Sequence, residues 1–369
     1  MSTYSLTSES VCAGHPDKIC DQISDAVLDA ALTADKYARV AVETLVTKDF
    51  VALAGEVSCA KKLDYKAIAR KTIKKLGYTQ AKLGFTDKSP ITVRIHEQSR
   101  EIAVGVDTEG AGDQGMMFGY ATNETKEFMP LSIVLAHRLA EAVDLARIGK
   151  TIPHLRPDGK TQITLDYQNG HLKNVAQVVI AVPHEPAMTL AALKRALLAK
   201  VVQPLLKEYG LKITAEQLLV NGTGHWYIGG PASDTGVTGR KIVVDSYGSI
   251  AHVGGGCFSG KDPTKVDRSG AYAARFYAKN LVAAGLAARA EVRLAYVIGT
   301  KVPVMLDVDT FDTATKPKAY LLEFMRSLLN PSVGSIINDF DLRRPMYAET
   351  AAYGHFGRNG FPWEKVVVV

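Results

Sequence analysis

Four glycines, a lysine and a carboxylate fall within nine residues at 254–262, in the run GGGCFSGKD. Glycine adopts backbone φ values that side chains usually forbid, so such a run can turn its N–H groups inward. A concave set of amides binds phosphate, and Lys261 would add a point charge. Lys265, Asp267 and Arg268 follow closely. The segment predicts a phosphate-binding loop, and a glycine-rich surface turn is the alternative.

This loop nearly matches a P-loop. Gly255, Gly260 and Lys261 have the required spacing, but the next position does not fit. A P-loop needs Ser or Thr there to bind Mg²⁺, and it runs directly into a helix. Asp262 is a carboxylate, and Pro263 disfavours helical angles at the residue before it. We therefore expect a phosphate loop of another kind.

A second cluster lies at 14–18, in the run GHPDK, just before a helical pattern. Pro16 suits the first position of a helix, which places Asp17 in the first turn beside His15. The positive helix end, a carboxylate that can bind a cation and a glycine that allows close approach coincide here. Asp17 is therefore a candidate metal ligand.

The helix predicted over 17–32 has an apolar arc and an acidic arc. Leu28 is the apolar residue that falls on the acidic side. Carboxylates four residues apart repel one another unless cations or partner residues compensate. We interpret the carboxylates that follow Asp17 as a solvated acidic face: Asp21, Asp25 and Asp29.

Cations near the glycine-rich segments exceed what a mononucleotide needs: His15, Lys18, Lys160, Arg240, Lys241, Lys261 and Lys265. A triphosphate, with a charge of about −4, is neutralised by Lys, Arg and divalent metal together. Asp17 and Asp267 are the candidate Mg²⁺ ligands, because each adjoins a cation-rich turn. No motif for a nucleophilic Ser or Cys and no kinase motif is present. The sequence predicts direct displacement between bound substrates, in which stabilisation of the departing anion supplies the rate.

Composition indicates an ordinary globular protein of 369 residues, 47% of them hydrophobic, with a net charge of +6 spread along the chain. This charge suits anionic small molecules, and no nucleic-acid partner is expected because no basic tail or arginine stripe occurs. Cys12, Cys20, Cys59 and Cys257 lack paired spacing, so a reducing cytoplasm fits better than a zinc site or disulfides. Neither a signal peptide nor an apolar run of bilayer length is present, so no membrane partner is expected.

Three successive units of strands and helices follow from the periodicity. The first has strands at 39–47, 51–57, 91–97 and 102–106 and a basic helix at 62–76. The second has helices at 131–148 and at 189–209, the latter kinked at Pro204, and a hairpin, 161–168 with 171–182, around Asn169-Gly170. The third has strands at 241–245 and 291–298, helices at 269–288 and 318–329, and an ordered loop at 347–363.

This pattern predicts an α+β fold of three similar domains with pseudo-threefold symmetry, in which helices cover mostly antiparallel sheets. We expect domains at 1–100, 108–228 and 229–369, which exchange segments in space. A Rossmann fold is disfavoured, because no strand runs into a GxGxxG helix start.

Five motifs occur together in this chain: GHPDK at 14–18, GAGDQG at 110–115 with MFGYATNE at 117–124, GRK at 239–241, the 254–262 run, and AAYGHFG at 351–357. In this order and over nearly the whole chain they resemble the methionine adenosyltransferases, or S-adenosylmethionine synthetases. The GAGDQG run alone would equally suit a turn.

The resemblance implies that the sulfur of L-methionine attacks C5′ of ATP and expels triphosphate, which is then cut to pyrophosphate and phosphate. It implies that His15, Lys160, Arg240 and Lys261 are catalytic. Asp17 and Asp267 would hold two Mg²⁺, and Glu43 would hold one K⁺. The implied ATP-binding residues are His15, Lys18, Asp158, Lys160, His225, Trp226, Asp234, Arg240, Lys241, Cys257 and Lys261. The implied methionine-binding residues are Glu56, Gln98, Asp113, Asp234, Lys265 and Ile298.

The resemblance also implies homodimers that share active sites and pair into tetramers. Some positions depart from the family pattern. The chain is shorter than usual between Gln98 and Gly112, with Glu101 in place of Asp. The run NGTGHW at 221–226 replaces Asn-Pro-Ser/Thr-Gly-basic-Phe, and Cys257 replaces a common Ala. These changes bear on the gate and on the methionine end of the pocket, where S-alkyl homocysteine analogues would bind.

Two other functions fit parts of the sequence. The near-P-loop at 254–262 would suit an ATP hydrolase or kinase, which releases ADP. The positive charge would suit a nucleotide sensor or nucleic-acid binder, but aromatic and arginine residues are not interleaved as such proteins require.

Overall fold

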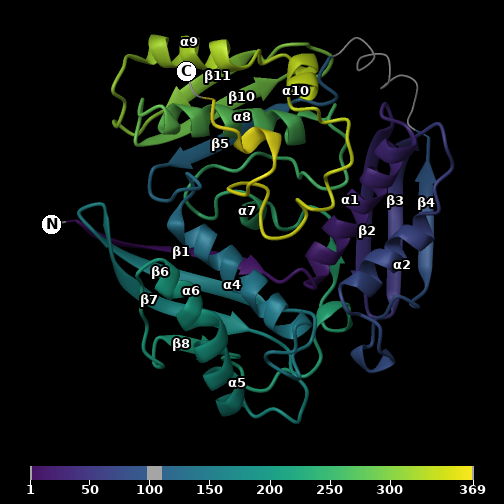
Figure 1. The fold of residues 1–369 in the computed structure, drawn as a ribbon. Helices are drawn as coiled ribbons and strands as arrows, with labels where there is room; N and C mark the ends of the chain where they lie inside the picture. The colour runs from purple at the N-terminus through teal and green to yellow at the C-terminus, as the bar shows by residue number, and fades with distance from the viewer. Residues whose placement is uncertain (1, 98–109, 368–369) are drawn as a thin grey trace.

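The structure is a computed structural model that describes residues 2–97 and 110–367. Within these residues the strands form three sheets, each covered by helices (Figure 1). Most pairs of strands are antiparallel, and β3 with β4 and β7 with β8 are parallel. In this described part, no helix has the length and apolar character to cross a membrane.

The first unit contains the sheet β4-β3-β2-β9. Its strands are β2 (Arg39–Thr47), β3 (Phe50–Ser58), β4 (Ile91–His96) and β9 (Gly236–Val237), and its helices are α1 (Pro16–Ala34) and α2 (Tyr65–Lys75). A short 3₁₀ turn, η1 (Ala81–Leu83), follows α2. The predicted strand at 102–106 lies outside the described residues.

The central unit contains the sheet β1-β6-β7-β8. Its strands are β1 (Thr3–Val11), β6 (Lys160–Gln168), β7 (His171–Ala181) and β8 (Leu218–Val220), and its helices are α4 (Leu131–Ile148), α5 (Leu190–Leu197) and α6 (Gln203–Glu208). The predicted interruption at Pro204 is confirmed, because a π-helical turn, η2 (Leu198–Val202), separates α5 from α6. Proline lacks the N–H that would continue the helix.

The third unit contains the sheet β11-β10-β5. Its strands are β5 (Gly115–Thr122), β10 (Arg289–Tyr296) and β11 (Met305–Asp309), and its helices are α8 (Val266–Ala283), α9 (Lys318–Leu328) and α10 (Val333–Asp339). Short helical turns are η3 (Gly230–Ala232), α7 (Ile242–Asp245) and η4 (Pro362–Glu364). The loop predicted at 347–363 is ordered, with Trp363 stacked 3.7 Å from Tyr272.

Each unit gives one strand to another unit. β1 precedes α1 in sequence yet pairs with β6, and β5 precedes α4 yet pairs with β10. β9 precedes α8 yet pairs with β2, which closes the cycle. The α+β class with three similar units is therefore confirmed, and each unit is completed by a strand from elsewhere in the chain.

Two predictions of secondary structure need correction. The predicted strand at 241–245 is wrong, because Ile242–Asp245 forms the helical turn α7. Its apolar run, Ile-Val-Val, suits a strand, but β-propensity yields to tertiary context. The predicted helix at 269–288 begins earlier, at Val266, and ends at Ala283.

The prediction of a solvated acidic face on α1 is also wrong. Asp21 and Asp25 are fully buried, and Asp29 is half-buried. With Asp17 they form a line of carboxylates, here called the aspartate row, that accepts backbone N–H groups from the last third of the chain. The donors are Val237 to Asp17, Gly239 to Asp21, Gly260 to Asp25, and Tyr347 and Ala348 to Asp29.

Buried cations complete the aspartate row. The Lys18 ammonium lies 2.8 Å from Asp21 and 2.5 Å from Asp245. Arg268 binds Asp25 through two nitrogens, at 2.7 and 2.9 Å. Because Leu28 is also buried, α1 is enclosed on both its apolar and its acidic side.

We predict that Asp25→Ala lowers the free energy of unfolding by about 3–5 kcal/mol, because it leaves the buried Arg268 guanidinium without its carboxylate. Denaturant unfolding measures the loss. Asp309→Ala is the control, since its ion pair with Arg293 is partly exposed and is worth about 1 kcal/mol or less. Equal losses in the two variants would contradict a central role for the aspartate row.

Candidate active site

The N-terminus of α1 carries a histidine whose two ring nitrogens differ in their contacts. His15 is the N-cap residue, and its Nδ1 accepts a hydrogen bond of 3.2 Å from the N–H of Asp17. Its Nε2 is buried and has no hydrogen-bond partner within the described part of the chain. Because Nδ1 is an acceptor, the proton of the neutral ring lies on Nε2.

Basic side chains surround this histidine. The Lys241 ammonium lies 2.6 Å from the Asp17 carboxylate, and Arg240, 54% exposed, lies 3.8 Å from it. Burial, the positive charge of Lys241 and that of Lys160 lower the pKa of His15 to about 3, against the opposite effect of Asp17. Burial alone would raise the pKa of Asp17. The hydrogen bonds from Lys241 and from the Val237 N–H have the larger effect and hold this pKa below its usual value.

Asp158 joins two neighbouring loops. Its carboxylate accepts the N–H of Gly159 at 2.7 Å and the N–H of Gly230 at 2.6 Å. Burial raises the pKa of Asp158 to about 6, although both N–H groups act against this rise. Lys160 follows at the start of β6 with an exposed side chain, and Asp234 is exposed beyond η3.

The predicted phosphate loop pairs with β2 rather than entering a helix. Val42 donates to the carbonyl of Gly260, and Asp262 donates to that of Val40, each at 3.0 Å. The Lys261 ammonium between them binds the Asp267 carboxylate on α8. A P-loop must continue directly into its helix, so this geometry disfavours the kinase or hydrolase alternative.

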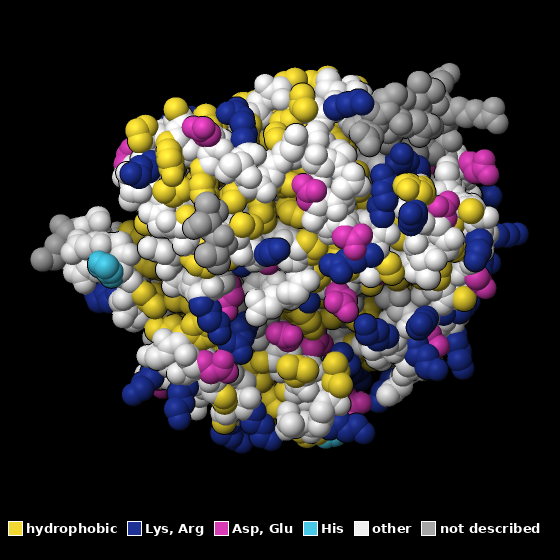
Figure 2. Space-filling model, turned by 45° about the horizontal axis from the view of Figure 1, so that its top comes forward, with side chains coloured by type: hydrophobic (Ala, Val, Ile, Leu, Met, Phe, Trp, Pro, Cys, Tyr) yellow, Lys and Arg dark blue, Asp and Glu magenta, His cyan; other side chains and the backbone are white. Residues whose placement is uncertain are grey.

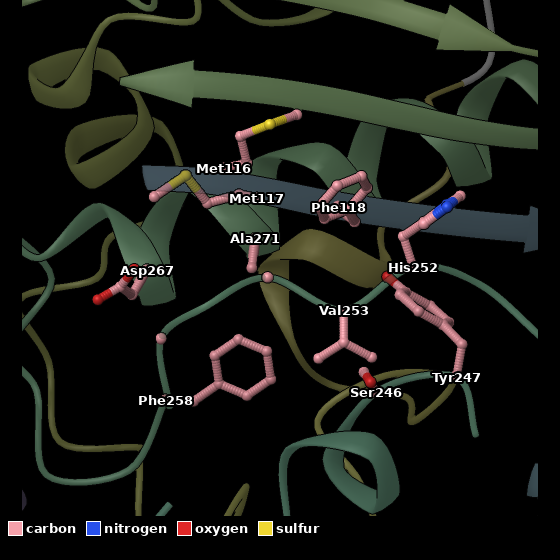
Figure 3. A pocket seen from close by; sticks show the side chains of 12 residues that line it. Met116, Met117, Phe118, Ser246, Tyr247, His252, Val253, Phe258, Asp267 and Ala271 are labelled. Atoms are coloured by element: carbon pink, nitrogen blue, oxygen red, sulfur yellow. The ribbon is translucent and has the colours of Figure 1, made fainter. Parts of the chain in front are cut away.

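Glycines allow this loop to approach its neighbours. A Cβ on Gly260, whose φ is 83°, would lie 2.1 Å from the carbonyl oxygen of Val42. A Cβ on Gly256 would lie 2.1 Å from the carboxyl carbon of Asp267. Asp267 also lines a small cavity between α8, β5 and the loop (Figure 3).

Two sets of side chains thus adjoin each other. The His15 set contains His15, Asp17, Lys160, Arg240 and Lys241. The Lys261 set contains Lys261, Asp267, Glu43, Asp113 and Cys257. They meet where Gly239 packs on Cys257, since a Cβ on this glycine would lie 2.8 Å from the cysteine sulfur. Segments from all three thirds of the chain contribute to them.

Several predicted residues lie at the edge of these sets or below them. Lys18 is buried under the His15 set, and its ammonium forms ion pairs with Asp21 and Asp245. Lys265 binds Asp262. Glu56 lies 3.4 Å from His96, and Ile298 is 56% exposed. Gln98 lies outside the described residues.

Two more predicted residues, His225 and Trp226, lie in the loop between β8 and η3. The His225 ring stacks 5.3 Å from Tyr227, and both rings contact His184, which sequence reasoning missed. His184 lies in the loop after β7, between Pro183 and Pro186, and a lone histidine there carries no signal in sequence. Trp226 donates its indole N–H to the carbonyl of Ile228 at 2.7 Å, within the loop between β8 and η3.

The fold and these sets define a three-domain α+β protein in which basic and acidic side chains gather where the domains meet. The domain models of the S-adenosylmethionine synthetase family match residues 3–100 (N-terminal), 108–226 (central) and 228–365 (C-terminal). The chain belongs to this family. The predictions of this family and of an adenosyl-transferring enzyme are therefore confirmed.

Curated relatives are similar over nearly the full length. The S-adenosylmethionine synthase of Desulforudis audaxviator is 50% identical, over 99% of this chain and 97% of its own. That of Thermus thermophilus is 50% identical, over 98% and 95%. That of Corynebacterium kroppenstedtii is 47% identical, over 98% and 96%.

We predict that Gly260→Ala weakens ATP binding more than tenfold, because the new methyl group pushes the loop away from β2 and displaces Lys261. Calorimetric titration with a non-hydrolysable ATP analogue measures the change. Gly285→Ala is the matched control: its φ of 69° is similarly strained, but no atom of the described residues lies within 4 Å of the new Cβ. If both variants bound the analogue equally well, the pairing with β2 would not be what places Lys261.

Proposed function

We propose that this chain makes S-adenosylmethionine by direct attack of the L-methionine sulfur on C5′ of ATP. The S–C5′ bond forms as the C5′–O bond breaks, and the electron pair leaves with the triphosphate. Water then splits the triphosphate into pyrophosphate and phosphate. The observation that carries the proposal is the buried Nε2 of His15, which has no hydrogen-bond partner among the described residues and lies near Lys241, Lys160 and Lys18.

In this proposal His15 stabilises the departing triphosphate as a neutral hydrogen-bond donor. Its low pKa keeps the ring neutral at physiological pH, and the N–H of Asp17 fixes the tautomer that exposes a proton on Nε2. A donor held ready where charge develops stabilises a transition state without reorganising during the reaction. A neutral imidazole at a helix N-terminus is a known form of such a donor.

The basic side chains of the two sets bind the phosphates in different ways. Lys160 and Arg240 are exposed and can contact phosphates, and Arg240 assists their hydrolysis. Lys241 and Lys261 are bound to carboxylates here and would turn to the phosphate oxygens when metal takes those carboxylates. Their combined charge suits a triphosphate better than a mononucleotide.

The donor set fits Mg²⁺ at two positions. Within residues 2–97 and 110–367 no three acidic, histidine or cysteine groups form a ready metal cage. Mg²⁺ needs none, because it binds through one or two carboxylates together with substrate phosphates and water. Asp17 and Asp267 would each hold one Mg²⁺, which neutralises phosphate charge when bound.

A K⁺ at Glu43 fits the negative charge of the neighbouring carboxylates. Burial raises the pKa of Glu43, and Asp21 and Glu56 raise it further, while Lys261 acts against them. A monovalent cation beside these carboxylates would reduce their mutual repulsion. We place one K⁺ per chain there.

Methionine, or an S-alkyl homocysteine analogue, would bind near Glu56, Gln98, Asp113, Asp234, Lys265 and Ile298.

We propose that two copies of the chain share these sites, with the His15 set of one copy facing the Lys261 set of the other. Exposed apolar side chains beside Ile298 support this, since Val297, Val302 and Val304 are between 41% and 65% exposed. On the face in Figure 2, hydrophobic side chains lie between acidic and basic ones. Dimers would pair into tetramers in the cytoplasm, where four free cysteines stay reduced.

Purified protein given ATP, L-methionine, Mg²⁺ and K⁺ is expected to release S-adenosylmethionine, pyrophosphate and phosphate, which mass spectrometry and phosphate assays detect. His15→Ala is expected to reduce kcat by roughly 10²–10³-fold, the usual cost of losing one such donor. His171→Ala, at an exposed hairpin position, is the control and should keep full activity. Release of ADP by the wild type would refute the proposed function, and full turnover by His15→Ala would refute the role of His15.

Chelation of Mg²⁺ should stop the reaction, and Asp267→Asn should raise the Mg²⁺ concentration for half-maximal rate by roughly 10–100-fold. The amide keeps the shape of the side chain but loses the charge that binds the cation. Asp307→Asn, whose carboxylate pairs with Lys318 on another part of the third unit, serves as the control. An unchanged Mg²⁺ dependence in Asp267→Asn would remove Asp267 from the metal site.

A further inference from the structure

One tyrosine hydroxyl lies between two loops of the site. Tyr78 follows the end of α2, and its side chain is buried. Its Oη lies 2.6 Å from the carbonyl oxygen of Gly14 and 2.6 Å from that of Pro157. Gly14 directly precedes His15, and Pro157 directly precedes Asp158. A single side chain thus contacts the backbone of both segments.

A third segment packs on the same hydroxyl. A Cβ on Gly230 would lie 2.2 Å from the Tyr78 Oη, and the N–H of this glycine binds Asp158. The first two segments also touch, since a Cβ on Gly14 would lie 1.8 Å from the Pro157 carbonyl oxygen. Tyr78 therefore lies at the junction of loops from the first, second and third units.

The chemistry of this junction requires a donor. Two carbonyl oxygens that point at one place repel each other, and both are acceptors only. The tyrosine O–H is the donor that both can share, and burial raises its pKa well above the usual value, so that it keeps its proton. Without it, both carbonyls would be buried near each other with no shared donor.

The tyrosine itself is held in place. Its ring meets Phe85 edge-on, with ring centres 5.5 Å apart. Its N–H donates to Ile73 at 3.3 Å, and its carbonyl accepts from Asp87 at 2.9 Å. The hydroxyl cannot move away from the two loops unless the end of α2 moves with it.

We propose that Tyr78 is a positioning residue for adenosyl transfer, whose hydroxyl fixes the turn before His15 against the segment before Asp158 and so sets the direction of the His15 Nε2. This inference rests on the proposed function. The segment that carries Arg240 is held differently, because Asp17 and Asp21 bind the N–H groups of Val237 and Gly239. Loss of the hydroxyl should therefore affect transfer more than triphosphate hydrolysis.

The test is Tyr78→Phe, assayed for two activities in the full-length protein. S-adenosylmethionine formation should fall in kcat by about tenfold or more, since small misplacements of a catalytic group have large effects. KM for methionine should stay within about twofold, and hydrolysis of added tripolyphosphate should fall less than about threefold, because the Arg240 segment keeps its own supports.

Tyr277→Phe is the matched control. Tyr277 is also buried, and its hydroxyl donates at 2.8 Å to the carbonyl of Leu329, within the third unit. It should lose some thermal stability and keep the ratio of the two activities. If Tyr78→Phe does not fold, Phe85→Leu, which keeps the hydroxyl but removes its edge-on support, is measured in the same way.

The outcomes separate this inference from the proposed function. A wild type that makes no S-adenosylmethionine defeats the proposed function. If the wild type makes it but Tyr78→Phe, or Phe85→Leu in its place, keeps the wild-type ratio of the two activities, only the role of Tyr78 is refuted. A selective loss of transfer supports it.

Discussion

The aspartate row of α1 is the constraint on which the rest of the structure depends. Each of its four carboxylates accepts at least one backbone N–H from the last third of the chain. Burying carboxylates is costly unless hydrogen bonds and cations compensate, and here the N–H groups, Lys18 and Arg268 do so. Because the donors are backbone groups of the loops that carry Arg240, Lys241 and Lys261, the same bonds that hold the units together also place the site.

Local pattern predicted much of this molecule. The helix α1, the Asn169-Gly170 hairpin and the π-helical turn before Pro204 follow from periodicity, turn chemistry and the missing N–H of proline. The role of Asp21 and Asp25 could not be predicted in this way. An amphipathic helix with an acidic arc is normally solvated there, and two of the compensating partners, Gly239 and Arg268, lie more than two hundred residues away. The strand assigned to 241–245 failed for a similar reason, since tertiary packing decided the conformation of a short apolar run.

In the candidate site too, local motifs predicted some features and contacts between units determined the others. Motifs indicated His15, Asp17, Lys261 and Asp267, because glycine, cations and carboxylates in short runs suit phosphate and metal. Their joining through Gly239 and Cys257, and the burial of Lys18 beneath them, depend on contacts between units that no local pattern encodes. His184 and Tyr78 stand alone in sequence, and only their neighbours in space give them a role.

The cyclic exchange of strands has a consequence for the synthesis of the protein. β1 leaves the ribosome long before its partner β6, which begins at Lys160, and β2 gains β9 only at Gly236. At usual elongation rates β1 waits roughly 8 to 30 s for β6. During that time the edge of β1 is open to other nascent chains. Two of its inward-facing residues, Ser8 and Ser10, carry polar hydroxyl groups rather than apolar side chains. Polar groups on an unpaired edge limit association with other chains until the proper partner arrives.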